Sequence, residues 1–202
     1  NLTSLTSLSF TEGLYGQYPR IEKKLIYDNR KNLIALSGNI YGIIPQLILN
    51  QGIDKAEEEL KWWLDTFKED FYLEINRHGL DEEEHLNEVL TDFSKKYNVK
   101  IIAANDVFYL NKNDSTAHDI LLCIKQGEFI STPIGKGRGK RFGYKNQEYY
   151  FKSQKEMKTL FSDIPQSIIN INEIINKIEN YDLEREVVLP KYQIPDAFKK
   201  SK

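Results

Sequence analysis

Several residue types are scarce in this sequence, and each scarcity removes a class of protein. A single cysteine, Cys123, excludes a disulfide framework within the chain and fits a reducing compartment. No apolar run approaches the ~20 residues needed to cross a bilayer. Neither sign of charge dominates, because 28 Lys and Arg face 30 Asp and Glu for a net charge of −2. A uniformly basic nucleic-acid-binding domain is therefore not indicated, although local basic patches stay open.

The first residues contain no recognisable targeting signal. They lack a charged region followed by an apolar core, so we predict no signal peptide and a cytoplasmic protein. The chain starts at Asn1 and at once places Leu2, Leu5 and Leu8 on one helical face. We interpret the sequence as a segment of a longer protein.

The middle of the chain alternates between strand and helix patterns. Short apolar runs predict strands at 33–37, 71–75 and 100–104, the first of them buried on both faces. Helical periodicity predicts helices at 43–49, 54–68 and 81–97. Asp81 is the expected cap of the last helix, whose first turn is acidic and whose last turn is basic. This order is typical of an α/β fold with a parallel sheet.

The flanking segments are less regular. Before the strands we predict a helix at 2–9, a turn at 12–16 and an extended stretch at 18–21. After them we predict a helix at 115–124, with Cys123 as a small buried hydrophobe, and extended backbone at 148–151. Two further helices follow a capping box of Ser153 and Glu156 and a first-turn Pro165. Pro190 and Pro195 indicate an extended exit.

A basic, glycine-rich loop covers residues 135–141. It does not match a phosphate-binding P-loop, because Phe142 follows the last basic residue where the motif needs Ser or Thr. Two interpretations stay open, a solvated flexible loop and a nucleic-acid contact. In the second, the contacts are the four basic side chains Lys136, Arg138, Lys140 and Arg141.

Polar residues follow each predicted strand. They are Asn39, Glu74 to His78, and Asn105 with Asp106. Functional groups of parallel sheets gather at these strand ends. Asp106 is a metal ligand or general base in one interpretation, and caps a turn in the other. No second His or Cys stands at ligand spacing from His78, His85 or His118, so a zinc motif is absent.

Several stretches resemble, in order, the PHP (polymerase and histidinol phosphatase) domain of bacterial DNA polymerase III alpha subunits. They include Leu33–Gly38, Phe71–Ile75 with Arg77–Gly79, Ala104–Val107, Ala117–Ile124 and Leu189–Tyr192. The resemblance implies a partial, distorted β/α (TIM-like) barrel followed by a mainly helical segment. It places the C-terminal part of the barrel at 1–125, and the basic loop, helices and a linker toward the polymerase palm at 126–202.

The resemblance also implies which metal ligands are altered. The family often has Cys where this chain has Asn39, and has Asn-Asp-x-His where this chain reads Asn105-Asp106-Val107-Phe108. An amide is a poor ligand for a transition metal and a phenyl ring is none. We therefore expect a vestigial site with Asp106 alone retained, no cofactor in this segment and no catalytic residue. Magnesium belongs to the parent polymerase, and zinc or manganese only to an intact PHP site.

Two functions follow from the resemblance. The first is a structural and interaction module of a replicative polymerase, which contacts the rest of the alpha chain and a proofreading exonuclease subunit and meets DNA through the parent chain. The alternative is a metal-dependent phosphoesterase or 3′-5′ exonuclease of the PHP class. Because the early barrel strands are missing, we expect either self-association or a sheet edge covered by the N-terminal helix and the tail.

Overall fold

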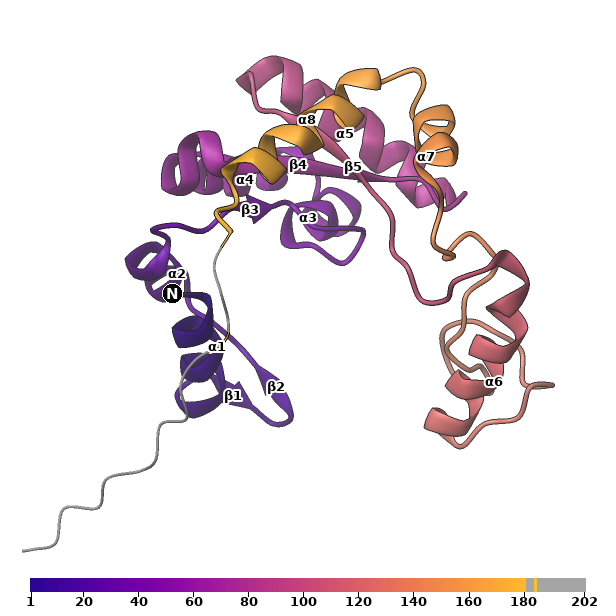
Figure 1. The fold of residues 1–202 in the computed structure, drawn as a ribbon. Helices are drawn as coiled ribbons and strands as arrows, with labels where there is room; N and C mark the ends of the chain where they lie inside the picture. The colour runs from indigo at the N-terminus through magenta and orange to yellow at the C-terminus, as the bar shows by residue number, and fades with distance from the viewer. Residues whose placement is uncertain (181–183, 185–202) are drawn as a thin grey trace, which may run out of the picture.

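A parallel sheet lies at the centre of the fold. The computed structural model describes residues 1–180 and 184. The sheet has the order β3-β4-β5 and consists of β3 (Ala35–Leu36), β4 (Phe71–Asn76) and β5 (Ile101–Ala104). Its strands are parallel, with Leu73 opposite Ile101, and the connections between them are helical (Figure 1). The predicted α/β fold with a parallel sheet is confirmed.

Helices pack around this sheet and enclose one hydrophobic core. They are α3 (Ile43–Gln51), α4 (Ile53–Phe67), the 3-10 turn η1 (Lys68–Asp70), α5 (Asp81–Tyr97) and α8 (Pro165–Lys177). Apolar side chains at helical spacing supply the core, among them Leu60 of α4 and Leu90 of α5, which belong to the same buried cluster as Leu73 of the central strand. The helical period thus explains why these predicted helices form.

Helix α5 shows how local sequence sets an element's ends. Acidic residues fill its first turn, Lys95 and Lys96 fill its last, and Asn98 ends it in the left-handed conformation. The predicted cap is wrong in detail. Leu80 occupies the cap position and Asp81 is the first helical residue, so its carboxylate acts on the helix dipole and makes no cap hydrogen bond.

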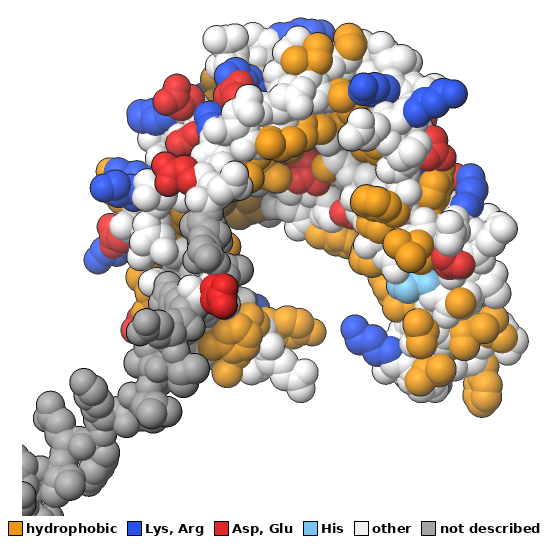
Figure 2. All heavy atoms as spheres, in the orientation of Figure 1, with side chains coloured by type: hydrophobic (Ala, Val, Ile, Leu, Met, Phe, Trp, Pro, Cys, Tyr) orange, Lys and Arg blue, Asp and Glu red, His pale blue; other side chains and the backbone are white. Residues whose placement is uncertain are grey.

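Two groups of elements project from this centre on the same side (Figure 1). The first contains α1 (Leu2–Thr11), the hairpin of β1 (Leu14–Tyr15) and β2 (Tyr18–Pro19), and α2 (Lys23–Asn29). The second, which we name the α6 arm, spans residues 105–152 with η2 (Lys112–Asp114) and α6 (Ser115–Gln126). Figure 2 shows an open hollow between the two groups. Helix α7 (Gln154–Leu160) then leads back to α8.

Strand β3 and helix α2 differ from what the sequence predicts. Strand β3 has two residues, and Leu36 is 42% exposed rather than buried on both faces. It is an edge strand, so one side of it has no neighbour within the described residues. Helix α2 is not predicted, because none of its residues is buried and its sequence has no apolar period.

The opposite sheet edge, formed by β5, is covered by α8. Asn170 of α8 donates a hydrogen bond of 2.8 Å to the backbone carbonyl of Ile101 in β5. Helix α1 packs mainly against α2 and β1. The expected cover by the tail falls, with the extended exit at Pro190 and Pro195, outside the described residues. Self-association stays a prediction.

The C-terminal helices form as predicted. The capping box of Ser153 and Glu156 opens α7, and Pro165 is the first residue of α8. Because α8 covers β5, part of the predicted segment 126–202 belongs to the same body as the sheet. The boundary at residue 125 itself stays a prediction. None of the described helices combines the length and apolar character needed to cross a membrane.

An ion cluster fixes α8 to the sheet and predicts an acid-sensitive contact. Glu173 accepts hydrogen bonds from Lys100 and, at 2.8 Å, from the hydroxyl of Tyr72. These two partners, Lys100 first, lower the pKa of Glu173 to about 2 from an ordinary value of 4.5. A carboxyl group whose pKa is lower in the folded protein than in the unfolded chain stabilises the fold at pH values above the unfolded-chain pKa. This stabilisation is lost as the pH falls toward the pKa of the folded protein.

We therefore expect Glu173→Gln to lower the melting temperature by a few degrees at neutral pH. The difference from the wild type should shrink between about pH 4.5 and pH 2. Thermal melts followed by circular dichroism at several pH values measure it. Glu88→Gln is the control, because Glu88 is exposed and has no ion pair among the described residues. Equal effects of both changes at all pH values would contradict the prediction.

Candidate functional site

The polar residues that follow the three strands meet at one edge of the sheet. Parallel strands place their carboxyl ends together, so the loops after β3, β4 and β5 are neighbours. Asn39, His78 and Asp106 come from these three loops and are linked by hydrogen bonds. The sequence-based grouping of strand-end residues is therefore matched by the structure.

The loop after β3 is built to bring Asn39 to this edge. Gly38 has a φ of 78°, which favours glycine. Gly42 passes so close to Ser37 that a Cβ would lie 2.2 Å from its carbonyl oxygen. The buried Ser37 hydroxyl accepts a hydrogen bond of 2.8 Å from the Glu74 N–H. These contacts fix the turn that presents Asn39.

Asn39 and Asp106 form a direct pair. The Asn39 amide Nδ2 donates to Asp106 Oδ2 at 2.9 Å, and its Oδ1 accepts from the Tyr41 N–H at 2.9 Å. Both ends of the amide are thus engaged. The geometry shows Asp106 as an acceptor between strand ends.

His78 joins the same edge from the loop after β4. Its side chain is 1% exposed, and its Nδ1 lies 2.6 Å from Oε1 of the buried Glu83. Its Nε2 accepts a hydrogen bond of 3.1 Å from the Asp106 N–H. This second bond requires a bare Nε2, so Nδ1 carries the proton and the ring is neutral. His78 therefore positions the backbone of Asp106 and leaves no ring nitrogen for a metal.

Two carboxylates lie close enough to influence each other. Burial, and then the charge of Asp106, raise the pKa of Glu74, while a hydrogen bond from Asn76 opposes the rise. The Oδ1 atom of Asn76 is buried and makes no hydrogen bond within the described residues. Glu74, Asn76 and Asp106 thus offer oxygen atoms only, which are the donors that hard cations such as Mg²⁺ prefer.

Phe108 stands two residues after Asp106 and belongs to an aromatic cluster. Its ring stacks on Tyr144 at a centroid distance of 4.9 Å and on His118 at 5.6 Å. Tyr149 lies beside it and stacks on the ring of His78 at 4.4 Å. Position 108 therefore contributes packing, with no atom that can ligate a metal.

The donor set does not fit a transition metal. Such ions prefer thiolate and imidazole donors, whereas position 39 holds an amide bonded to Asp106 and position 108 a phenyl ring. Within residues 1–180, no group of three or more His, Cys, Asp or Glu side chains is arranged to hold a metal.

The basic loop separates into exposed and buried cations. Lys136, Arg138 and Lys140 are exposed, whereas Arg141 is 4% exposed. Arg141 binds both carboxylate oxygens of Asp119, at 2.6 and 2.8 Å, and this partner raises its pKa. The placement corrects the prediction for Arg141, because a buried and paired guanidinium is not free to meet a phosphate.

Two other expectations concern single side chains. Cys123 is buried, as the sequence predicts, and His85 is exposed on α5. The pairing of His78 with Glu83 is not predicted. A signal for it exists, because Glu83 shares a helical face with Leu86, Asn87 and Leu90, all of which are buried.

Comparison with known proteins now adds to this geometry. Residues 1–78 match the model of the PHP domain family. The chain is 39% identical over 199 residues to the DNA polymerase III subunit alpha of Borreliella burgdorferi, covering 98% of this chain and 17% of that protein. It is 36% identical over 187 residues to the subunit of Campylobacter jejuni, covering 88% of this chain and 15% of that protein.

The same relationship extends to Thermus aquaticus. Its DNA polymerase III subunit alpha is 36% identical over 163 residues, covering 81% of this chain and 13% of that protein. The chain thus spans less than a fifth of the length of these relatives.

Proposed function

Because this chain contains part of a PHP domain and belongs to the bacterial DNA polymerase III alpha-subunit family, we propose that it is a non-catalytic module of a replicative DNA polymerase. The parent chain would perform DNA-directed DNA synthesis. This segment would brace that chain and take part in docking a proofreading exonuclease subunit.

The pairing of Asn39 with Asp106 is the observation that carries this proposal. The amide occupies Oδ2 of Asp106, the one retained ligand position, and Phe108 fills the next position with aromatic packing. A hydrogen bond thus takes the place that a metal bridge would occupy between the strand ends. On this proposal the edge is held together without a cofactor.

One set of atoms favours the alternative, a metal-dependent phosphoesterase or 3′-5′ exonuclease. Burial first, and then the charge of Asp106, raise the pKa of the neighbouring Glu74, and the buried Asn76 Oδ1 has no partner among the described residues. A hard cation would neutralise the two carboxylates and satisfy the amide oxygen. Magnesium or manganese is therefore the metal that this alternative requires.

The β3 edge supports a structural role within a larger chain. Leu36 is 42% exposed on a two-residue edge strand, and Tyr41 and Ile43 just beyond it are 71% and 48% exposed. Exposed apolar groups beside an unpaired strand edge are typical of a surface that another segment covers. We assign this surface to the rest of the parent alpha chain.

Metal analysis and a nuclease assay test the proposal together. We expect less than stoichiometric zinc, manganese and iron by plasma mass spectrometry, both in this chain and in the full-length polymerase. We also expect no hydrolysis of DNA 3′ ends by this chain with added Mg²⁺ or Mn²⁺. Stoichiometric metal, or cleavage that Asp106→Asn abolishes, would overturn the proposal of a non-catalytic module and favour the metal-dependent phosphoesterase.

A further inference from the structure

Basic charge is concentrated in the α6 arm. Residues 105–152 contain eight Lys and Arg against five Asp and Glu, within a chain whose net charge is −2. Three of these cations are engaged, because Lys112 and Lys152 meet Glu148 and Arg141 meets Asp119. The other five are exposed and have no acidic partner among the described residues: Lys125, Lys136, Arg138, Lys140 and Lys145.

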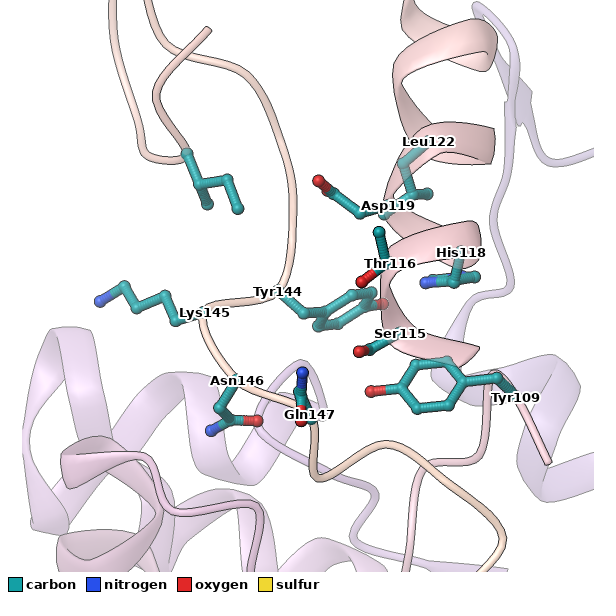
Figure 3. Close-up of a pocket in the computed structure, with 11 residues that line it drawn as sticks. Tyr109, Ser115, Thr116, His118, Asp119, Leu122, Tyr144, Lys145, Asn146 and Gln147 are labelled. Atoms are coloured by element: carbon teal, nitrogen blue, oxygen red, sulfur yellow. The ribbon is translucent and has the colours of Figure 1, made fainter. Parts of the chain in front are cut away.

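A cavity of about 200 Å³ lies in the same arm, between α6 and the loop 144–147. Figure 3 shows the hydroxyls of Ser115 and Thr116 and the ring of Tyr144 facing one another across it, with Gln147 at one end. Tyr109 closes the cavity near Gln147. Its hydroxyl oxygen is buried and makes no hydrogen bond within the described part of the chain. A buried polar atom without a partner costs free energy unless a bound group satisfies it.

The lining selects an uncharged, planar ligand over a phosphate. Figure 3 shows the Lys145 side chain directed away from the cavity. Arg141 is bound to both carboxylate oxygens of Asp119, so the guanidinium is not free to hold a phosphate in the cavity. Hydroxyl and amide groups both donate and accept hydrogen bonds, as the edge of a nucleobase requires. The Tyr144 ring, which also stacks on Phe108, lines the cavity and adds an aromatic surface that a base can contact.

The cavity and the exposed cations complement each other. A base in the cavity leaves its sugar-phosphate backbone outside, where Lys136, Arg138 and Lys140 are available. Bases in a duplex are already paired and stacked, so an extruded base is least costly in a single strand. Aromatic surfaces beside a basic track are the usual means of binding single-stranded nucleic acid.

We infer that the α6 arm binds single-stranded DNA, with one base held between α6 and Tyr144 and the phosphates on the basic loop. The choice of DNA over RNA rests on the proposed polymerase function. The site itself does not, since it contains none of the strand-end residues Asn39, Glu74 or Asp106. If the proposal of a metal-free module failed, this inference would therefore still stand. If this inference failed, the proposal of a metal-free module would be unaffected.

The test uses the whole 202-residue chain and a short fluorescein-labelled oligothymidylate, followed by fluorescence anisotropy over a range of salt. An oligonucleotide of equal length and charge with abasic sites, and a duplex, are the reference ligands. We expect the single strand to bind most tightly. Equal binding of the abasic strand or of the duplex would overturn the base site.

Two variants separate the phosphate track from the cavity. Changing Lys136, Arg138 and Lys140 together to Gln should flatten the plot of log Kobs against log salt by about 2, from about 0.7 for each phosphate contact. The same change at the exposed Lys24, Lys155 and Lys158 alters net charge equally and should leave the slope unchanged. An equal slope for both triple variants would overturn the assignment to the loop.

Tyr109→Phe tests the cavity without disturbing the fold. It removes only a hydroxyl that makes no hydrogen bond within the described residues, so the melting temperature should not fall. Affinity for oligothymidylate should drop about 2- to 10-fold, the range for one hydrogen bond, while affinity for the abasic strand stays constant. Unchanged affinity for oligothymidylate would overturn the role of the cavity.

Discussion

A Glu83→Ala variant is expected to lose about 2–6 kcal/mol of unfolding free energy, because each of the two buried donors that it leaves unsatisfied costs about 1–3 kcal/mol. Glu83 is 5% exposed and accepts from both the His78 N–H, at 2.5 Å, and His78 Nδ1, at 2.6 Å. Its removal leaves two buried donors unsatisfied. It also frees the ring that holds the Asp106 N–H, so the strand-end loops should loosen together.

Urea unfolding followed by circular dichroism measures this loss. Glu84→Ala is the matched control, because Glu84 is the next residue on the same turn and is exposed. It should change stability by less than about 0.5 kcal/mol. Glu83→Gln keeps one acceptor for His78 and should fall between the two. A Glu83→Ala variant as stable as Glu84→Ala would show that the pair does not hold the edge.

The helices of this fold could be predicted because burial imposes a period on their sequences. Helix α5 runs over the predicted residues 81–97, and α8 starts at the predicted Pro165. Helix α2 could not be predicted from an apolar period. It buries no residue, so no apolar period marks it.

The candidate site was predictable only where it depends on strand order. Asn39 and Asp106 each follow a strand, and a parallel sheet brings such positions together whatever lies between them. The contacts of His78 depend instead on how the short loop 77–80 folds back onto α5. Loop conformations of this kind are set by tertiary packing, and the sequence pattern carries little of that information.

Arg141 illustrates a different limit. In the sequence it ends a run of basic residues and glycines, which is typical of an exposed loop. In the structure it pairs with Asp119, which lies 22 residues earlier on α6. Composition describes a segment as a whole. Whether one side chain is exposed or buried depends on a partner that folding brings near. The three cations before Arg141 do remain exposed.

The second large effect is a gain of metal binding. If Asn39 and Phe108 are what removed the metal, then Asn39→Cys with Phe108→His should return a thiolate and an imidazole beside Asp106. Second-shell partners alone change metal affinity about 10–100-fold, and restoring two direct ligands should exceed that. We expect the double variant to bind one Co²⁺ or Zn²⁺ per chain, with a thiolate-to-cobalt charge-transfer band that the parent chain lacks.

The matched control is Asn39→Ser with Phe108→Leu, which removes the same amide and ring without adding soft donors. It controls for loss of the hydrogen bond to Asp106 and of the stacking on Tyr144. Cys123 is buried in both variants and in the parent chain, so a new thiolate band reports on position 39 alone. If the control binds the metal as tightly as the Cys and His variant, the two altered positions do not explain the absence of ligation. The strand-end oxygens of Glu74, Asn76 and Asp106 would then be the metal site, and the edge would have to be assigned to a hard cation.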